Sequence, residues 1–290
     1  PSYGVWHTPE KHQGVEAQWM WYNGDTRLKE QFAREVVGDS IGAYFRYKFD
    51  KEEVVELKVG ISYVSIANAR ENLEKEIGNR TFDEVYTAAR QTWNDALRAT
   101  VEGGTDEQKT IFYTALYHAL IHPNLLNDVN GDYPESKTNK IGKNHQRYTV
   151  FSLWDTYRNY HQLLTLLYPE QQLQMVRTML DIYKESGWLP KWELNSTETF
   201  TMVGDPASIV LADTYLRGLT DFDIQTAYEA MLKGANTIEG NPIRPGVKEY
   251  WKLGYLSVDG GVRGPVSTTQ EYNAADFAIA QIAKKLGKKA

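Results

Sequence analysis

The chain has 290 residues, of which 41% are hydrophobic, enough for one large domain or two ordinary ones. With 38 acidic against 32 basic residues, a formal charge of −6 and no long run of lysine or arginine, it is not expected to bind nucleic acid. The absence of cysteine excludes disulfides and thiolate metal sites, and no stretch approaches the roughly 20 apolar residues of a membrane span.

The N-terminal part of the chain shows the period-two alternation that is typical of half-buried β-strands. Residues 41–49 and 53–65 both alternate, and the polar stretch Asp50-Lys51-Glu52 between them predicts a hairpin. Because two strands do not make a stable sheet, we expect them to be the last strands of a sheet that begins before Pro1.

Beyond Ser65 the apolar residues recur with the helical period. Capping boxes predict helix starts at Thr81, Thr105 and Ser152, each of which has Glu, Gln or Asp three residues later. Proline and capping residues predict further helix starts at Pro169, Asp205, Asp221 and Ser267. Glycines predict helix ends at Gly187, Gly218, Gly234 and Gly287. Helices of about ten to twenty residues in this rhythm predict a mainly α fold of stacked helical hairpins.

The stretch "SLWDTYR" places several polar and aromatic residues at the start of a predicted helix. Trp154, Asp155 and Arg158 together offer a stacking plane, a hydroxyl acceptor and a donor fork, which is a set that can hold a polyol. Structural roles remain equally open: Asp155 can close a capping box, Arg158 can form a surface pair and Trp154 can be core.

A second stretch, "LPKWEL", repeats the combination on a loop. Trp192 and Glu193 lie in one of two long links, residues 122–151 and 187–206, which are rich in glycine, proline, asparagine and aromatic residues. Long ordered loops on a helical scaffold usually build a site. Glu193 could bind a hydroxyl or act as a general acid, or it could be an ordinary solvated loop charge.

Other polar residues give weaker indications. Glu271 and Asp276 lie five apart on the last predicted helix and therefore point to different faces, while Asp213 is predicted to be a buried polar group with a partner. His118 and His122 are four apart and could share a helix face. No third metal ligand is placed by spacing, so structural histidines are the favoured interpretation.

Nine ordered blocks of the chain resemble the central part of glycoside hydrolase family 92, the calcium-dependent exo-acting α-mannosidases. Among them are "NDVNGDY", "FSLWDTYRNYH", "LPKWEL", "TMVGDPASIVLADTYLRG" and "STTQEYNAADFAIAQIAKKLGK", and the resemblance runs roughly from Ile41 to Ala290. It implies a β-sandwich followed by an (α/α)6 toroid. Residues 1–65 would then be the last strands of the sandwich, 66–100 linker helices and 101–290 the first half of the toroid.

The resemblance also implies an activity, the removal of terminal α-linked mannose from N-glycans or mannans with inversion, of the α-1,2-mannosidase type. Inversion needs one carboxylic acid and one carboxylate base. The family blocks that carry this acid and base lie beyond Ala290, so we expect no catalytic residue in this chain and an inactive internal fragment. Calcium is the implied cofactor, with most ligands outside the chain, and the implied localisation is periplasmic or secreted.

The family's sugar-holding residues transfer to Trp154, Asp155, Arg158, Trp192 and Glu193, which the resemblance places around the nonreducing mannose. The chain departs from the family at Gln162, where Pro is often found, and at Gln270, where Leu is common. Of the family's paired acid at Ala275 and Asp276 only Asp276 is present, which puts any role of the last helix in doubt. The alternatives are another toroid glycosidase, glucoamylase-like or trehalase-like, and a non-catalytic glycan-binding helical module. The sequence does not indicate linkage preference or oligomeric state.

Overall fold

The computed structural model describes residues 2–7, 27–30, 41–143 and 145–288. The chain divides into two compact units, residues 1–57 and residues 58–290. Residues 8–26 and 31–40 of the predicted first domain lie outside the described residues.

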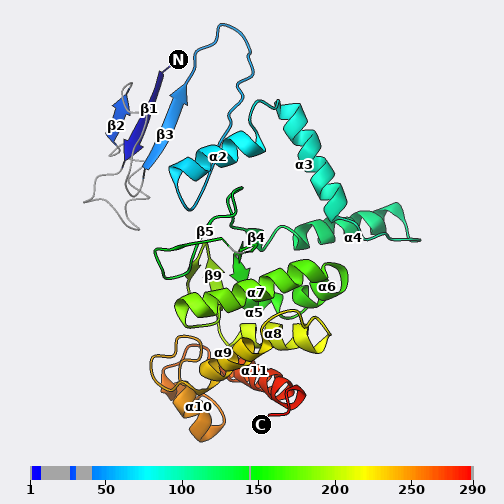
Figure 1. Ribbon diagram of the computed structural model, residues 1–290, viewed down its shortest axis with the longest axis vertical. Helices are drawn as coiled ribbons and strands as arrows, with labels where there is room; N and C mark the ends of the chain where they lie inside the picture. The colour runs from blue at the N-terminus through cyan, green and yellow to red at the C-terminus, as the bar shows by residue number, and fades with distance from the viewer. Residues whose placement is uncertain (1, 8–26, 31–40, 144, 289–290) are drawn as a thin grey trace. The chain divides into compact units, whose positions relative to one another are not determined.

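The first unit contains a three-stranded antiparallel sheet in the order β2-β1-β3 (Figure 1). Its strands are β1 (Ser2–His7), β2 (Arg27–Glu30) and β3 (Ile41–Arg46). The predicted strand at residues 41–49 is thus confirmed for its first six residues, but the predicted hairpin is wrong. β3 pairs with β1, with Val5 opposite Ala43.

The second half of the predicted hairpin, residues 53–65, forms no strand. Its apolar side chains find no buried face, since Leu57, Val59 and Ile61 are 72%, 61% and 70% exposed. Alternation alone therefore does not make a strand where no described strand pairs with the segment. The polar members hold it instead: the ammonium of Lys58 donates to the carbonyls of Gly78 and Arg80.

The next three helices follow their caps. They are α2 (Ile66–Glu76), α3 (Phe82–Ala96) and α4 (Asp106–Ala119). The predicted capping boxes of Thr81 with Glu84 and of Thr105 with Gln108 are both formed, each satisfying two backbone N–H groups.

Short strands interrupt the helices in the two long links. β4 (Asn124–Leu125) pairs with β7 (Tyr148–Thr149), and β5 (Tyr133–Pro134) pairs with β6 (Ile141–Gly142). A third small sheet has the order β10-β9-β8, built from β8 (Phe151–Ser152), β9 (Trp192–Leu194) and β10 (Thr197–Glu198). This last sheet joins the two links.

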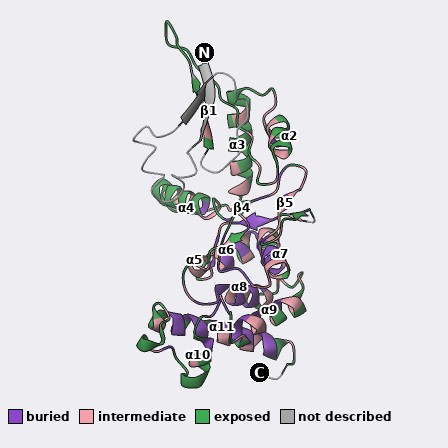
Figure 2. Ribbon diagram, turned by 90° about the vertical axis from the view of Figure 1, so that its left-hand side faces the viewer, coloured by how far each residue is buried: buried purple, intermediate pink, exposed green. Residues whose placement is uncertain are grey.

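The remainder is helical, and the predicted mainly α fold is confirmed. In chain order come α5 (Leu153–Thr156), α6 (Tyr160–Leu167), α7 (Pro169–Ser186), α8 (Pro206–Leu216), α9 (Ile224–Asn236), α10 (Val247–Leu253), the 3-10 turn η3 (Val258–Gly260) and α11 (Pro265–Lys285). The apolar helix α8 packs against α11, α6 and α7. Figure 2 shows the buried residues concentrated in these helices. Four of them are completely buried: Val176, Met179, Leu211 and Ile282.

Three predicted helix starts are corrected by the structure. The helix expected from Ser152 is broken into α5 and α6, and the Ser152 hydroxyl donates to the Asp155 carboxylate instead of capping a backbone N–H. α9 starts after Asp223, whose carboxylate accepts from the Thr226 N–H, while Asp221 accepts from Arg177.

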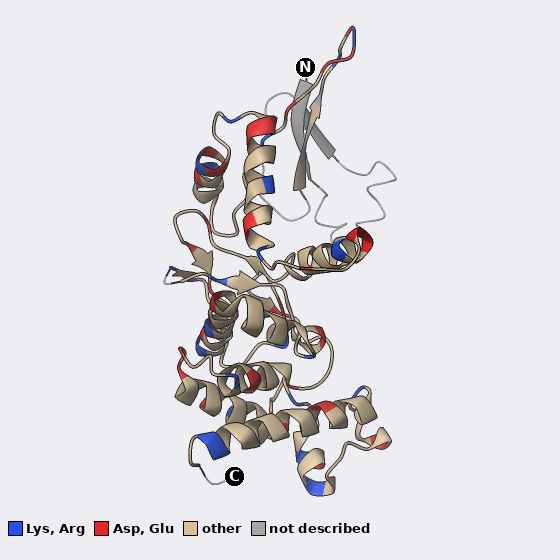
Figure 3. Cartoon of the chain, turned by 90° about the vertical axis from the view of Figure 1, so that its right-hand side faces the viewer, with Lys and Arg blue, Asp and Glu red and all other residues tan. Residues whose placement is uncertain are grey.

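The last helix also starts earlier than predicted. α11 begins at Pro265 after Gly264, whose φ of 59° is a left-handed conformation that glycine adopts without strain. The hydroxyl of Ser267 donates to the carbonyl of Gly264. At the other end Lys284 and Lys285 lie in the last turn, where the helix dipole favours positive charge (Figure 3).

Candidate substrate-binding site

The small sheet β8-β9 brings the two predicted sugar-holding stretches side by side. Ser152 lies opposite Trp192 in the register and Phe151 lies opposite Glu193. Because α5 starts directly after β8, the first turn of α5 and the strand β9 lie next to each other. Two segments about forty residues apart in sequence are thus joined at one place.

Three side chains of the "WDTYR" stretch converge on one carboxylate from α11. The indole Nε1 of Trp154 donates to Oε1 of Glu271 at 3.1 Å, and Nη2 of Arg158 donates to the same oxygen at 2.9 Å. The Tyr157 hydroxyl donates to Oε2 at 2.8 Å. Burial and the hydrogen bond to Glu271 raise the pKa of Tyr157 to about 12, so this hydroxyl stays a donor.

Cation–π contacts complete the cluster. The guanidinium carbon of Arg158 lies 4.5 Å from the centroid of the Trp154 ring and 4.7 Å from that of Tyr157. The Arg158 side chain is 45% exposed, and Asp155 beside it is exposed. An acceptor and a donor therefore face solvent next to an indole.

Glu193, expected to contact the sugar, does not face solvent. Its side chain is fully buried, and its carboxylate accepts from the Thr149 hydroxyl and from the N–H groups of Val150 and Ser196. Burial raises the pKa of this carboxyl, while these hydrogen bonds oppose the shift. Val150 and Ser196 have left-handed φ angles of 66° and 65°, so the carboxylate holds two strained residues in place.

The loop after β9 carries more of this strain. Phe200 and Met202 have φ angles of 51° and 69°, which are uncommon outside glycine. The Glu198 carboxylate fixes the loop, because it accepts from the N–H groups of Lys191, Trp192 and Phe200. The loop lines a cavity of about 320 Å³ together with side chains of α11.

Lys191 lies at the buried wall of this cavity. Its side chain is nearly inaccessible, and its ammonium donates to the Ile243 carbonyl at 2.7 Å. Burial lowers the pKa of Lys191 to about 8, although Asp205 and Glu198 act in the opposite direction.

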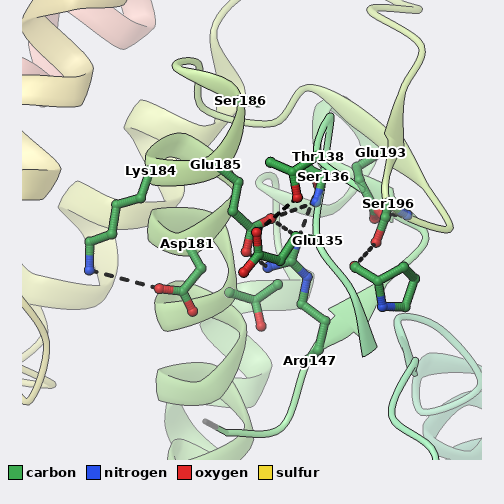
Figure 4. Close-up of polar contacts among 12 residues, drawn as sticks. Glu135, Ser136, Thr138, Arg147, Asp181, Lys184, Glu185, Ser186, Glu193 and Ser196 are labelled. Atoms are coloured by element: carbon green, nitrogen blue, oxygen red, sulfur yellow. Dashed lines mark hydrogen bonds and ion pairs between the residues drawn. The ribbon is translucent and has the colours of Figure 1, made fainter. Parts of the chain in front are cut away.

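An ion pair holds the first long link to α7 (Figure 4). The Arg147 side chain is fully buried and donates to both oxygens of Glu185 at 2.9 Å and to the Ser136 hydroxyl at 3.0 Å. The Ser196 hydroxyl, in the second long link, donates to the carbonyl of Pro134 in the first. The two links therefore support each other.

Glu271 and Asp276 point to different faces of α11, as the sequence predicted. Asp276 accepts from the Arg244 guanidinium at 2.6 Å and from the Tyr250 hydroxyl at 2.8 Å, and Arg244 also donates to Asp205. The sequence did not place Glu271 at the site. In the structure Thr268 and Ala275, three residues before Glu271 and four after it, are buried on the same helix face, and a glutamate on such a face needs partners.

Two histidines and one aspartate differ from the sequence prediction. α4 ends at Ala119, so His122 lies beyond the helix and shares no face with His118. Asp213 is half-buried rather than buried, because its carboxylate turns outward to accept from Arg217 at 2.8 Å. Within the described residues no three His, Asp or Glu side chains come together as a metal site.

The oxygen-rich loop Asp128–Asp132 does not fit calcium either. The Asp128 carboxylate accepts from Ser62, Asn68 and Asn72, and Asp132 pairs with Lys143 at 2.9 Å. Since these donors already occupy the oxygens that a calcium ion would require, this loop does not provide a calcium site. None of the described helices is long and apolar enough to cross a membrane.

The known proteins that this chain resembles are glycosidases. An uncharacterized secreted glycosidase of Arthroderma benhamiae is 29% identical over 254 residues, which are 81% of this chain and 28% of the relative. A family GH92 α-mannosidase structure from Bacteroides thetaiotaomicron is 36% identical with a TM-score of 0.72, over 78% of this chain and 30% of that one. The same enzyme has been solved with mannoimidazole.

A family GH92 inverting mannosidase from Bacteroides thetaiotaomicron VPI-5482 is similar over 99% of this chain and 37% of its own, at 25% identity and a TM-score of 0.76. The chain therefore spans between 28% and 37% of the length of these relatives. The partial (α/α)6 toroid expected from the sequence is confirmed by this likeness. The model of the glycosyl hydrolase family 92 catalytic domain matches residues 68–290, and the chain belongs to that family.

Proposed function

We propose that this chain is an internal part of an exo-acting α-mannosidase that removes terminal α-linked mannose from N-glycans or mannans. Family membership and two mannosidase structures with 36% and 25% identity support a glycosidase acting on mannose. We further propose inversion and the α-1,2-mannosidase type. One relative is described as an inverting mannosidase, and inversion requires a separated acid and base.

The observation that carries the proposal is the junction of the two sugar-holding stretches through β8 and β9. Ser152, directly before the helix turn that carries Trp154 and Asp155, lies opposite Trp192 in the register, and aromatic planes beside exposed polar groups suit a hexose. We assign the direct sugar contacts to Trp154, Asp155, Arg158 and Trp192. Glu193 was expected among them, and its burial supports a role in holding the strained loop beneath them.

We propose that the bond-breaking carboxylates and most calcium ligands are supplied by segments outside residues 1–290. Glu193 and Glu271 support this, since both carboxylates are committed to internal donors and the exposed Asp155 is assigned to the sugar. We also propose that residues 1–65 belong to a β-sandwich domain, 66–100 to linker helices and 101–290 to the toroid. Secretion or periplasmic localisation is proposed because one relative is a secreted glycosidase.

A sugar titration tests the proposed function. The chain is titrated with methyl α-mannoside, methyl α-glucoside and methyl α-galactoside, and binding is followed by tryptophan fluorescence. We expect a preference for the mannoside that Asp155→Asn abolishes. Asp83→Asn is the matched control, because Asp83 is also an exposed first-turn acid, in α3, and its removal should leave affinity unchanged.

Other results would contradict the proposal in different ways. Equal binding of the three sugars would remove the mannose assignment, and a preference for glucoside would favour another toroid glycosidase. Hydrolysis of α-mannobiosides by this chain alone would show that the acid and base are not outside it.

A further inference from the structure

We propose that Glu271 is a positioning residue for sugar binding, which fixes the orientation of Trp154 and Arg158 without itself touching the sugar. The inference rests on the proposed function, because it concerns how the same site is held. It adds to the site a residue on α11, a helix for which the sequence indicated no role.

The contacts of Glu271 favour an indirect role. Its side chain is about 10% exposed, and both carboxylate oxygens accept from Trp154, Tyr157 or Arg158. A carboxylate that accepts three internal donors has little capacity left for a sugar hydroxyl. It acts on the site through the groups it orients.

The clamp determines which surfaces Trp154 can offer. Its single N–H is used by Glu271, so the indole provides apolar ring surface and no hydrogen bond to a ligand. The Arg158 guanidinium lies 4.5 Å from the ring centroid and donates to the same carboxylate, so Glu271 holds the indole and the guanidinium together.

Arg158 is oriented by the same carboxylate. One of its five N–H groups donates to Glu271 and one to the Tyr157 hydroxyl at 3.0 Å. The side chain is still 45% exposed, so its remaining donors are available at the surface. Without Glu271 the guanidinium would lose its charged partner and keep the Tyr157 hydroxyl and the two aromatic rings as contacts.

Glu271 itself has no room to move. Gly204 has φ 87°, and a Cβ atom at this position would lie 2.6 Å from the Cβ of Glu271. The loop backbone therefore packs directly on the stem of the glutamate. The same loop is fixed at its start, where the Glu198 carboxylate accepts from the Trp192 N–H.

The test is the affinity for methyl α-mannoside of the complete 290-residue chain. Glu271→Gln keeps the shape but places an amide where three donors meet. Because hydrogen bonds to a charged group are among the stronger ones, we expect a loss of affinity of roughly 10- to 100-fold. Glu229→Gln, which removes an exposed glutamate from α9, is the control and should bind like the unmodified chain.

A double-mutant cycle separates positioning from a merely structural role. Trp154→Phe keeps a ring and removes the N–H, so its effect on affinity should overlap with that of Glu271→Gln. Additive losses would overturn the inference, as would unchanged affinity of Glu271→Gln. If the glutamate variant does not fold, Tyr157→Phe removes one of the three donors to Glu271 without changing a residue assigned to the sugar, and unchanged affinity would also overturn the inference.

The two proposals fail in different ways. Absence of mannoside binding by the unmodified chain contradicts both the proposed function and this inference. Binding by the unmodified chain with equal binding by Glu271→Gln contradicts the inference alone.

Discussion

Arg147→Met should destabilise the second unit because it breaks a buried ion pair. Arg147 is fully buried and Glu185 is 11% exposed, so methionine would fill much of the space of the arginine but leave the carboxylate without its guanidinium. The backbone N–H of Ser136, at 2.7 Å, would be the donor that remains to Glu185. The first long link would then lose one of its attachments to α7, while those through Thr178 and Asp181 would remain.

The expected loss of unfolding free energy is about 3–5 kcal/mol, the range found when one partner of a buried pair is removed. The size comes from the uncompensated charge rather than from the attraction lost. Glu185→Leu alone should cost a similar amount, because it leaves the guanidinium buried. The double variant, Arg147→Met with Glu185→Leu, leaves no buried charge and should lose about 1–2 kcal/mol, from the unpaired groups of Ser136.

Urea unfolding followed by tryptophan fluorescence measures these free energies. Lys184→Met, which removes an exposed charge from the same helix, should change stability by less than about 0.5 kcal/mol. The reasoning is refuted if Arg147→Met costs under about 1 kcal/mol, or if the double variant loses the sum of the two single losses.

Three further predictions concern pH, packing and capping. Burial lowers the pKa of His161 to about 4, below the ordinary value of 6.5, so stability should be complete above about pH 6.5 and fall as the pH drops toward 4. His161→Gln should reduce this slope in melting temperatures taken from pH 8 to 4.5, and an unchanged slope would show that the imidazole does not cause it. Gly142→Ala should lose about 1–3 kcal/mol in urea unfolding, because a Cβ would lie 2.3 Å from the buried Tyr133 ring, and a neutral result would contradict that packing. Thr81→Ala should lose about 1 kcal/mol with its cap, whereas Ser152→Ala should lose less, and equal losses would restore the predicted cap at Ser152.

The parts of the fold that could be predicted are those set by local chemistry. Thr81 and Thr105 cap their helices as expected, because a capping box needs only residues three positions apart. Ser152 shows the same local pattern, yet its hydroxyl bonds the Asp155 side chain after a strand whose partner is forty residues away. A short-range rule fails where a long-range pairing sets the backbone.

For the candidate site, too, the sequence indicated some residues, whereas others became apparent only from long-range contacts. The resemblance pointed to Trp154 and Arg158, but not to the carboxylate that orients them, since Glu271 lies more than a hundred residues further along. The sequence pointed to Glu193, but not to its burial. Its carboxylate accepts from Val150 and Ser196, two residues with left-handed φ angles. Such strain has no sequence signal when the residue is valine or serine rather than glycine.

The five-residue spacing of Glu271 and Asp276 lets α11 take part in two separate polar clusters. Gly204 packs on Glu271, while the next residue, Asp205, accepts from Arg244, which also donates to Asp276. Two neighbouring loop residues are thus tied to two faces of α11. Because the same loop is held at both contacts, we expect the geometry of the proposed sugar-holding groups to depend on the buried Arg244 pair as well as on the groups themselves.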